Sequence, residues 1–400
     1  MKKLMCLGGS YFQTTVVKAA KRLGCYVIDV DYLPGNPAHK YADEYHNIST
    51  LDKEAVLDLA AKKGIDGIIS YASDVSAPTA AFVAEKLGLP TNPYETVVRM
   101  TRKDLFREYL KKHGFFVPES ARIRSFAEAA DFFERTGKAV ILKPARSSGS
   151  KGVCKAENLT RLQEAYRNAK QYSAGDEMVV EEFMNRDGYQ IAGDAFLENG
   201  KIVYFGIGEE HFDRLGNLLV PVGESFPSVL EKEKKEQAEN EIQRAVNLLG
   251  LKHGAVNLDV MFDKEGHIFI IELGPRNGGN LITDAIRLGG GPDLAEYTVR
   301  AALGENPGIP ENSHTTRYVS SYIYHSNSDG IFDGVEFTEL FKSRVRRSDL
   351  FVQKGDRVYR YDHGGFGLGA ALLEYETQEE MLYMMDHMEE FCRIRVKADL

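Results

Sequence analysis

Short apolar runs alternate with amphipathic segments over the first part of the chain. The apolar runs have the length and composition of buried strands and occur at residues 3–7, 26–31 and 66–71. The segments between and after these runs repeat apolar residues with a helical period and are residues 14–23, 53–63 and 77–87. Strands that alternate with helices in this way predict a parallel, doubly wound sheet.

A Gly8-Gly9-Ser10 turn follows the first predicted strand and directs the start of the next helix toward the crevice at the carboxyl end of the sheet. Its spacing is not the GxGxxG of a dinucleotide site, although Asp29 and Asp31 end the second strand where a ribose partner would lie. A small-molecule crevice, or a tight strand-to-helix turn without a ligand, is therefore favoured over a dinucleotide site.

A loop of small residues follows the strand predicted at 139–143, which stops at Pro144. Residues 145–153 read Ala-Arg-Ser-Ser-Gly-Ser-Lys-Gly-Val, and their backbone amides can lie against phosphate oxygens, with Lys143 at the base of the loop as a point charge. The loop lacks the GxxxxGK[ST] spacing of a Walker loop. A flexible loop without a ligand is the alternative interpretation.

A second hairpin is predicted just beyond the middle of the chain, with its turn at Glu198-Asn-Gly200. The residues that follow it, 209–229, are predicted to form a long loop of the kind that often covers a site. This loop contains Glu209, Glu210, His211 and Asp213. His211 is interpreted as a solvated loop histidine in preference to a metal ligand.

Residues 255–280 contain the strongest chemical signal in the chain. Two runs of alternating apolar and polar residues flank a turn, which predicts a β-hairpin with a two-residue loop at Glu265-Gly266. Asp259 precedes that loop by six residues and Glu272 follows it by six. The two acids are therefore predicted to be direct cross-strand partners, with Cβ atoms about 5 Å apart.

Two carboxylates this close repel each other, so that one keeps its proton or a cation lies between them. Oxygen ligands suit a hard divalent ion such as Mg²⁺, which completes its coordination with water and substrate phosphate. Arg276 follows in a Gly-Pro-Arg-Asn-Gly-Gly loop whose amides can face an anion. The pattern indicates a site for a magnesium-bound polyphosphate. The alternative is an exposed hairpin with two solvated acids.

Composition narrows the class of protein. The chain has 400 residues, enough for two or three domains, and its net charge of −9 with interspersed acids and bases argues against a role on nucleic acid or a membrane surface. The four cysteines lie far apart and indicate reduced thiols of a cytoplasmic protein; they are Cys6, Cys25, Cys154 and Cys392. No apolar run approaches the roughly 20 residues of a membrane span.

Several of these features occur in an order that resembles the ATP-grasp superfamily, and the similarity extends to about residue 305. The features are Lys103, Lys143, the loop of small residues, the Val180-Glu-Glu-Phe-Met184 segment, Asp259, Glu272 and Arg276. The resemblance implies a combined α/β and α+β fold, in which two lobes close on ATP. The expected domains are an N-terminal parallel α/β domain at 1–115, a small lobe with the glycine loop at 116–183, a large lobe with the metal hairpin at 184–310 and a small C-terminal α+β tail at 311–400.

The resemblance also implies a role for each of these residues. Lys103 and Lys143 would contact the ATP phosphates, and Asp259 and Glu272 would hold Mg²⁺, with Mn²⁺ as an alternative ion. Arg276, together with Lys143, would act in catalysis by steadying the transferring phosphoryl group. The remaining nucleotide contacts would come from the loop residues Ser148, Gly149, Ser150 and Gly152 and from the hinge residues Glu181, Glu182, Phe183 and Met184.

Two positions depart from the commonest pattern of the superfamily. Many members read Glu-x-Asn-Pro-Arg, with the Asn as a third metal ligand, but here that position is Gly274. The predicted register places Asn257 opposite Gly274, so its amide oxygen is one substitute ligand, and Asn277 is a second candidate. The acid that binds ribose after the hinge is replaced by Gln190, which can still hydrogen-bond to a sugar hydroxyl.

The resemblance implies an ATP-dependent carboxylate–amine ligase related to biotin carboxylase and to carbamoyl phosphate synthetase. In such enzymes ATP phosphorylates a carboxylate, and an amine or another nucleophile then displaces the phosphate. A carboxylating or carbamoyl-phosphate-forming enzyme and a non-catalytic ATP-binding protein remain as alternatives. Both carboxylates together with Arg276 favour catalysis, because binding of ATP alone does not require an arginine beside the reacting phosphate.

The partners expected for such an enzyme are a small-molecule carboxylate and a small-molecule amine. We expect no nucleic-acid partner, no membrane partner and a cytoplasmic location, and we leave a homodimer open. Loops at 8–13, 72–76 and 209–225 are expected to supply the residues of the substrate pocket.

Overall fold

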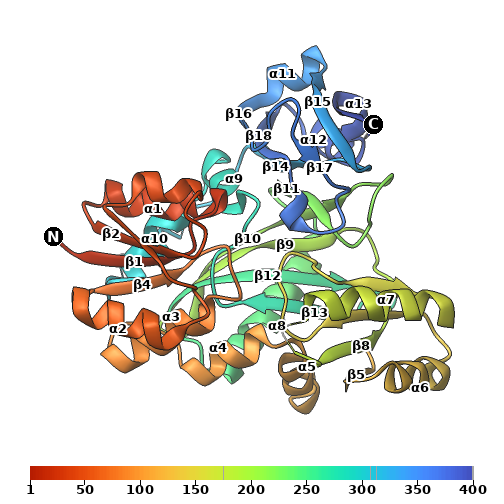
Figure 1. The fold of residues 1–400 in the computed structure, drawn as a ribbon, viewed down its shortest axis with the longest axis horizontal. Coiled ribbons are helices and arrows are strands. Elements are labelled where there is room, and N and C mark those ends of the chain that lie inside the picture. Colours follow the sequence, from red (N-terminus) through yellow and green to blue (C-terminus); the bar gives the residue numbers. More distant parts are fainter. Residues whose placement is uncertain (174, 307, 312, 399–400) are drawn as a thin grey trace.

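The computed structural model describes residues 1–398 except 174, 307 and 312. Figure 1 shows the N-terminal part, in red and orange, the C-terminal part, in blue, and a further lobe, in yellow, around green strands from the middle of the chain. The N-terminal sheet is parallel and the remaining sheets are antiparallel. The predicted combination of an α/β domain with α+β parts is confirmed.

The N-terminal part contains a four-stranded parallel sheet with the order β3-β2-β1-β4. Its strands are β1 (Lys3–Leu7), β2 (Tyr26–Asp31), β3 (Glu44–Asn47) and β4 (Gly67–Ser70). Its helices are α1 (Thr14–Arg22), α2 (Lys53–Lys63) and α3 (Ala77–Leu87), with short 3₁₀ turns η1 (Tyr11–Gln13) and η2 (Pro37–Tyr41). The doubly wound sheet predicted from the sequence is confirmed, and β3 adds an edge strand that the apolar pattern did not predict.

Two hydrophobic cores lie on opposite faces of this sheet. Leu4 and Cys6 contribute to a core with α1, whereas Met5 and Leu7 contribute to a core with α2 and α3, because successive side chains of a strand point to opposite faces. The α1 core also receives Val299 from α10 (Leu294–Ala302). A helix from late in the sequence therefore anchors the N-terminal sheet to the rest of the protein.

Helices α4 (Tyr94–Thr101) and α5 (Lys103–Lys112) lead from the N-terminal part to a small four-stranded sheet. This sheet is antiparallel with the order β5-β8-β6-β7. Its strands are β5 (Ser120–Ile123), β6 (Val140–Pro144), β7 (Cys154–Ala156) and β8 (Met178–Glu182), and its helices are α6 (Phe126–Thr136) and α7 (Leu159–Tyr172). The loop of small residues joins β6 to β7, at the edge of this lobe.

The largest sheet has eight strands in the order β13-β12-β9-β10-β11-β14-β18-β16. The strands are β9 (Gln190–Glu198), β10 (Lys201–Phe212), β11 (Pro221–Phe226), β12 (Gly254–Phe262), β13 (Ile268–Gly274), β14 (Tyr318–Tyr324), β16 (Val345–Leu350) and β18 (Gly369–Tyr375). Helix α8 (Lys232–Leu249) packs on the face that contains Leu258 and Val260. The opposite face is left for the cavity described below.

The eight-stranded sheet is continuous across residue 310, because β11 pairs with β14. Beyond it lie a three-stranded sheet of β15 (Gly330–Phe337), β17 (Arg357–Val358) and β19 (Cys392–Lys397), the helices α9 (Ile282–Leu288), α11 (Glu339–Arg344), α12 (Gln378–Asp386) and α13 (Met388–Phe391), and the turn η3 (Gly364–Phe366). The domain boundaries proposed from the sequence stay predictions. In the described part of the chain, no helix has the length and apolar character that crossing a membrane requires.

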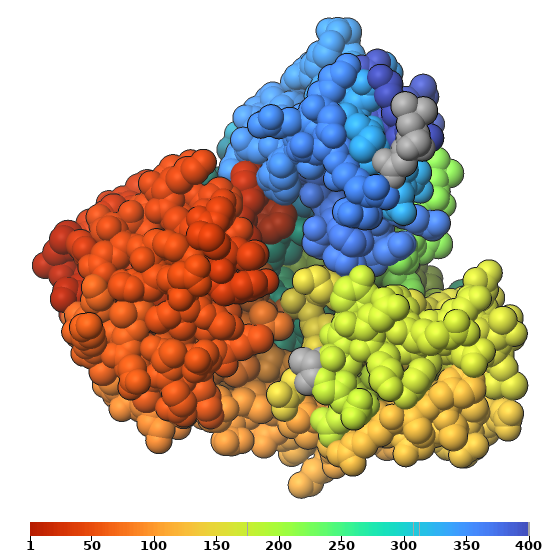
Figure 2. Space-filling model, viewed as in Figure 1, coloured from red at the N-terminus to blue at the C-terminus, as the bar shows by residue number. Residues whose placement is uncertain are grey.

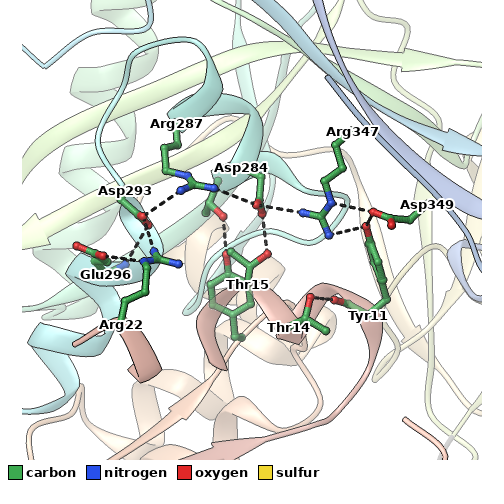
Figure 3. A network of polar contacts seen from close by, with 12 residues as sticks. Tyr11, Thr14, Thr15, Arg22, Asp284, Arg287, Asp293, Glu296, Arg347 and Asp349 are labelled. Atoms are coloured by element: carbon green, nitrogen blue, oxygen red, sulfur yellow. Dashed lines mark hydrogen bonds and ion pairs between the residues drawn. The ribbon is translucent and has the colours of Figure 1, made fainter. Parts of the chain in front are cut away.

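A network of polar contacts holds η1 against the C-terminal part (Figure 3). Arg347 of β16 donates from Nη2 to the Tyr11 hydroxyl at 2.6 Å and from Nε to Asp349 Oδ2 at 2.8 Å. The same guanidinium lies 3.4 Å from Asp284 Oδ1, and Thr15 of α1 donates to the other oxygen of Asp284 at 2.7 Å. Arg347 therefore joins η1, α9 and β16 at one point.

A second part of the network joins α1 to α10 (Figure 3). Arg22 donates to Asp293 Oδ2 at 2.7 Å and to Glu296 Oε1 at 3.1 Å. Arg287 of α9 lies 3.7 Å from Asp293. These exposed pairs contribute little stability one by one, but they fix the direction in which the N-terminal part faces the long sheet.

Gly193 lies in the middle of β9, between β10 and β12. Its φ is +148°, and a Cβ atom at this position would lie 2.1 Å from the backbone oxygen of Gly206. A side chain here would therefore separate two strands of the central sheet.

We predict that Gly193→Ala lowers the apparent melting temperature by several degrees, because the clash involves backbone and costs at least about 2 kcal/mol. Gly35→Ala is the control, since Gly35 is exposed and a Cβ atom there meets no atom within 4 Å. Thermal unfolding of both variants tests the prediction, and a Gly193→Ala protein with the wild-type midpoint would contradict it.

Candidate active site

A cavity of about 1750 Å³ lies between the parts of the chain. Figure 2 shows the surface hollowed where the N-terminal, yellow and blue parts meet. The predicted site residues that line the cavity are Lys103, Lys143, Ser148, Gly149, Ser150, Glu181, Glu182, Phe183, Met184, Gln190, Asn257, Asp259, Glu272 and Arg276. The structure thus brings most of the predicted residues together, and the roles assigned to them stay predictions.

The β12–β13 hairpin pairs Asp259 with Glu272 and Asn257 with Gly274, as the sequence predicted. The predicted two-residue loop is wrong, because the backbone amide of Asp263 donates to His267 at 3.0 Å and leaves three residues in the turn. The register then shifts by one residue between Asp259 and Val260. A β-bulge at Ile271 absorbs the extra residue and returns the two acids to direct opposition.

Arg107 of α5 holds this bulge in place. Its guanidinium donates from Nη1 to the backbone oxygen of Ile270 at 2.9 Å and from Nη2 to that of Ile271 at 3.2 Å. Its Nε donates to Glu181 Oε2 at 3.2 Å, and the group lies 4.5 Å from the centre of the Phe269 ring. Sequence reasoning missed Arg107, since a lone arginine on an amphipathic helix does not differ from a surface residue until its burial is known.

The opposed acids differ in their partners. Glu272 accepts a hydrogen bond from Lys103 Nζ at 2.7 Å, and Lys103 also donates to the backbone oxygen of Ser147. Asp259 accepts one from the amide of Gln190 at 2.8 Å. Removal from water and the nearby charge of Glu272 raise the pKa of Asp259 to about 7. The pair is therefore short of positive charge, as expected for a site that receives a cation.

Lys143 and Glu181 form a buried ion pair at the base of the loop of small residues. Burial alone would raise the pKa of Glu181, but the charges of Lys143 and Arg107 outweigh it and lower that pKa to about 2. Both partners line the cavity. Burial outweighs the charge of Glu181 and lowers the pKa of Lys143. Lys143 thus lies where an incoming anion can displace or share Glu181.

Arg276 is held by an acid from the N-terminal part. Its Nε donates to Asp74 Oδ1 at 2.8 Å, and Nη2 pairs with the other oxygen. Burial alone would raise the pKa of Asp74, but the charge of Arg276 outweighs it and keeps that pKa below its usual value. Asp74 lies in one of the loops expected to supply the pocket, and residues of all three expected loops line the cavity.

The two candidates for a third metal ligand lie in different surroundings. Asn257 lines the cavity, with its amide nitrogen donating to Gly193 O at 2.9 Å and to Asp194 Oδ1 at 3.0 Å. Asn277 is fully buried and donates to Asp194, while its amide oxygen accepts from Thr298 at 2.6 Å. The structure therefore brings Asn257 to the site and uses Asn277 to support it.

The loop of small residues closes one side of the cavity. Ser148, Gly149 and Ser150 line it, and the backbone oxygen of Gly149 accepts a hydrogen bond from Gly364 at 2.9 Å. Gly152 instead packs on Pro144, where an added Cβ would lie 3.0 Å from the ring at a φ of +74°. Gly152 therefore has a structural reason to be glycine, separate from the nucleotide contact predicted for it.

The long loop predicted at 209–229 is wrong over about half of its length, since β10 extends to Phe212 and β11 covers Pro221–Phe226. His211 is also not a solvated histidine. It is buried, with Nδ1 2.9 Å from Asp386 Oδ1 and Nε2 2.8 Å from the Ser225 hydroxyl. The polar residues of β10 have the pattern of a loop in the sequence, because the partners that bury them come from elements distant in the chain.

Known proteins share both sequence and fold with this chain. Residues 136–284 match the family model of the ATP-grasp domain. The formate-dependent phosphoribosylglycinamide formyltransferase of Wolinella succinogenes is 27% identical over 278 residues, which cover 68% of this chain and 70% of that protein.

Two solved structures superimpose over nearly the whole chain. The L-amino acid ligase of Bacillus licheniformis has a TM-score of 0.84 at 22% identity, with 99% of both chains covered. The biotin carboxylase domain of the 2-oxoglutarate carboxylase of Hydrogenobacter thermophilus, solved in complex with MgADP, ADP and bicarbonate, has a TM-score of 0.76 at 19% identity, covering 99% of this chain and 91% of that one.

A cavity between two α+β lobes, joined to an N-terminal parallel domain, is the architecture of an ATP-grasp protein. Residues 136–284 match the ATP-grasp domain family, and the solved structures share the fold of nearly the whole chain. The predicted superfamily and fold class are thereby confirmed. The predicted class of enzyme, an ATP-grasp ligase, is also confirmed by the named relatives.

We predict that Glu272→Gln lowers ATP-dependent turnover at least about 100-fold, because it removes an anionic ligand of the expected metal. The apo melting temperature is expected to change little, since the lost pair with Lys103 is offset by relief of repulsion at Asp259. The control is Glu265→Gln, an exposed acid in the turn of the same hairpin. Near-normal turnover of Glu272→Gln at ordinary magnesium would refute the two-carboxylate site.

Glu209 is a buried acid on β10 that does not line the cavity. Its Oε1 accepts from the Ser228 hydroxyl at 2.6 Å and from the Val229 amide at 2.8 Å, while Oε2 is buried without a hydrogen-bond partner. Burial raises the pKa of Glu209 to about 7. The folded protein therefore binds this proton more tightly than the unfolded chain.

We predict that the free energy of unfolding contributed by Glu209 falls as pH rises from about 4.5 through 7, by an amount on the order of a few kcal/mol. The sign follows from the raised pKa, since the ionised form is favoured only in the unfolded chain. Glu209→Gln mimics the protonated acid, and its free energy of unfolding is expected to fall less as pH rises. Melting temperatures measured from pH 5 to 8 test this, and parallel profiles for both proteins would contradict it.

Proposed function

We propose that this protein is an ATP-dependent ligase that phosphorylates a small-molecule carboxylate and joins the resulting acyl group to an amine, with release of ADP and phosphate. The observation that carries the proposal is a set of three cations around one cavity, each paired with an acid. The pairs are Lys103 with Glu272, Lys143 with Glu181 and Arg276 with Asp74. This arrangement suits a polyphosphate, whose oxygens exchange places with the acids.

ATP and Mg²⁺ are the proposed cofactors, with Mn²⁺ as the alternative ion. Asp259 and Glu272 would hold the metal, and the raised pKa of Asp259 supports this assignment because a divalent ion can replace the proton. The amide oxygen of Asn257 is the proposed third ligand. When bound, the metal would neutralise phosphate charge and orient the terminal phosphate. The related carboxylase was solved with MgADP.

Phosphoryl transfer depends mainly on positioning and on neutralisation of charge. Lys103 and Lys143 are proposed to bind the phosphates, and Arg276 to stabilise the charge that develops on the transferring group. Asp74 keeps the guanidinium directed at the cavity through two contacts. The loop at 145–153 and the residues 216–219 would exclude water from the acyl phosphate, since both segments line the cavity.

The substrates are proposed to be small molecules, since the enclosed cavity receives residues from all parts of the chain. The net charge of −9 supports the absence of a nucleic-acid partner. A cytoplasmic location and a homodimer complete the proposal, and both are open to direct measurement by fractionation and by light scattering.

The test is formation of acyl hydroxamate from ATP, a panel of carboxylates and hydroxylamine, with ADP release measured in parallel. We predict activity that requires Mg²⁺ with at least one carboxylate. Lys143→Ala is expected to weaken ATP binding about 10-fold to 150-fold, because a charge-assisted contact in a buried site contributes about 1.5–3 kcal/mol.

Lys138→Ala is the matched control, since Lys138 pairs with Glu182 while its own side chain is 62% exposed. It is expected to bind ATP as the wild type does. Wild-type affinity in Lys143→Ala by calorimetry would remove Lys143 from the site. Absence of ADP release and of hydroxamate with every carboxylate would refute the proposed ligase.

A further inference from the structure

Two acids face each other across neighbouring strands of the cavity wall, on strands other than those of the metal hairpin. Glu210 of β10 pairs directly with Glu224 of β11, which places their Cβ atoms about 5 Å apart. Both side chains line the cavity, and they are only 6% and 2% exposed. Strand β9 lies between β10 and the metal hairpin in the strand order, and Gln190 on β9 donates to both Glu210 and Asp259.

The hydrogen-bond partners of this pair are neutral. Glu224 accepts from the Ser321 hydroxyl at 2.7 Å and from the Asn280 amide at 3.3 Å. Glu210 accepts from the Gln190 amide, which also donates to Asp259. In contrast, the cavity acids Glu181, Glu272 and Asp74 each contact a lysine or arginine.

Because they are buried and no cation among the described residues is paired with them, Glu210 and Glu224 both hold a proton more tightly than an ordinary glutamate does. Burial raises the pKa of Glu224 to about 7. Burial, and then the charges of Asp259 and Glu224, raise the pKa of Glu210, and the charge of Arg186 at the exposed rim does not outweigh them. A cation that enters between two buried carboxylates without positive partners stabilises them.

The surroundings favour an ammonium group over a metal ion. Amide and hydroxyl hydrogens already occupy part of the carboxylate lone pairs, which leaves a few fixed acceptors of the kind that three N–H donors can use. A divalent ion at this pair would have to complete its coordination with water or with a ligand, because the pair supplies only two carboxylates. Within the described residues, the group of three side chains close enough to hold a metal is Asp263, Glu265 and His267, in the hairpin turn and outside this pair.

We propose that Glu210 and Glu224 bind the primary ammonium group of a substrate, an inference that rests on the proposed ligase function. The cavity then has a cation-lined region for polyphosphate and an acid-lined region for an amino compound. The ammonium group has two sources: the carboxylate substrate itself, as in an amino acid, or the amine that attacks the acyl phosphate. In the second case the ammonium group must lose a proton before it attacks, and one carboxylate of the pair can accept that proton. The experiment below distinguishes them.

The first arm measures hydroxamate formation, because hydroxylamine is uncharged near neutral pH and does not need an ammonium site. Carboxylates are supplied as matched pairs that differ only in amino or hydroxyl group: L-alanine and L-lactate, L-phenylalanine and L-phenyllactate, β-alanine and 3-hydroxypropionate. If the ammonium belongs to the carboxylate substrate, the wild type prefers the amino member at least tenfold in kcat/KM. Glu224→Gln and Glu210→Gln are expected to reduce that preference toward one.

The second arm supplies formate, acetate or L-lactate as the carboxylate and the same amino compounds as nucleophiles, with ADP release as the readout. If the ammonium belongs to the nucleophile, each variant raises the KM for the amino compound at least tenfold and leaves hydroxamate formation unchanged. In either arm the KM values for ATP and Mg²⁺ are expected to stay within about twofold of the wild type. Unchanged KM values for ATP and Mg²⁺ distinguish the loss of an ammonium contact from a general loss of structure in the cavity.

Glu209→Gln is the matched control, because it neutralises the neighbouring acid of the same strand outside the cavity. It is expected to retain the substrate preference of the wild type. The comparison of amino and hydroxy substrates in the wild type requires no variant, so the test does not depend on the folding of Glu224→Gln.

An active wild type with equal kcat/KM for amino and hydroxy substrates in both arms would overturn the ammonium site and leave the ligase proposal standing. Variants that raise the requirement for Mg²⁺ without changing substrate preference would also overturn it, in favour of a metal site. A wild type that forms neither hydroxamate nor ADP would overturn the ligase and this inference together.

Discussion

The guanidinium group of Arg107 connects the two lobes of the cavity, and the arrangement of the site depends on it. It donates to the backbone of β13 where Ile271 forms the bulge, and to Glu181, which in turn pairs with Lys143. Without the bulge, Asp259 would lose its position opposite Glu272. A planar group with several fixed donors can satisfy two carbonyls and a carboxylate at once. One side chain therefore supports the Asp259–Glu272 pair and Lys143 together.

Charge in the cavity is arranged as pairs in which one partner can be exchanged. Lys103, Lys143 and Arg276 each contact an acid, so that burying them in the absence of a ligand costs less than burying isolated ions. The proposed magnesium-bound polyphosphate keeps a net negative charge, so its oxygens can replace the acids in these contacts. Glu210 and Glu224 lack such partners, which gives the cavity a second region of opposite character and a direction along which two substrates can be ordered.

Apolar runs in the sequence correctly predicted the strands whose two faces are both buried. Residues 26–31 form an apolar run and a strand in the structure because helices cover both sides of a parallel sheet. The polar residues at 209–212 predicted a loop, but Glu209, Glu210 and His211 lie in strand β10. Each is buried against a polar partner from elsewhere: Ser228, Gln190 and Asp386. Polar residues in this stretch of sequence therefore indicated buried hydrogen bonds and not exposure to solvent, although Glu209 Oε2 stays without a partner.

The sequence by itself determined the order of the site residues and the parallel N-terminal sheet, because alternation along strands and the spacing of motifs are local properties. It predicted Asp259 opposite Glu272 from a two-residue turn that the structure replaces with a three-residue turn and a bulge. Only the tertiary structure decided the three-residue turn with its compensating bulge, the pairing of Arg276 with Asp74, and the choice of Asn257 over Asn277 to face the cavity. These features depend on contacts between residues far apart in the chain. Burial and charge pairing arise from such contacts, and one sequence does not contain their distances.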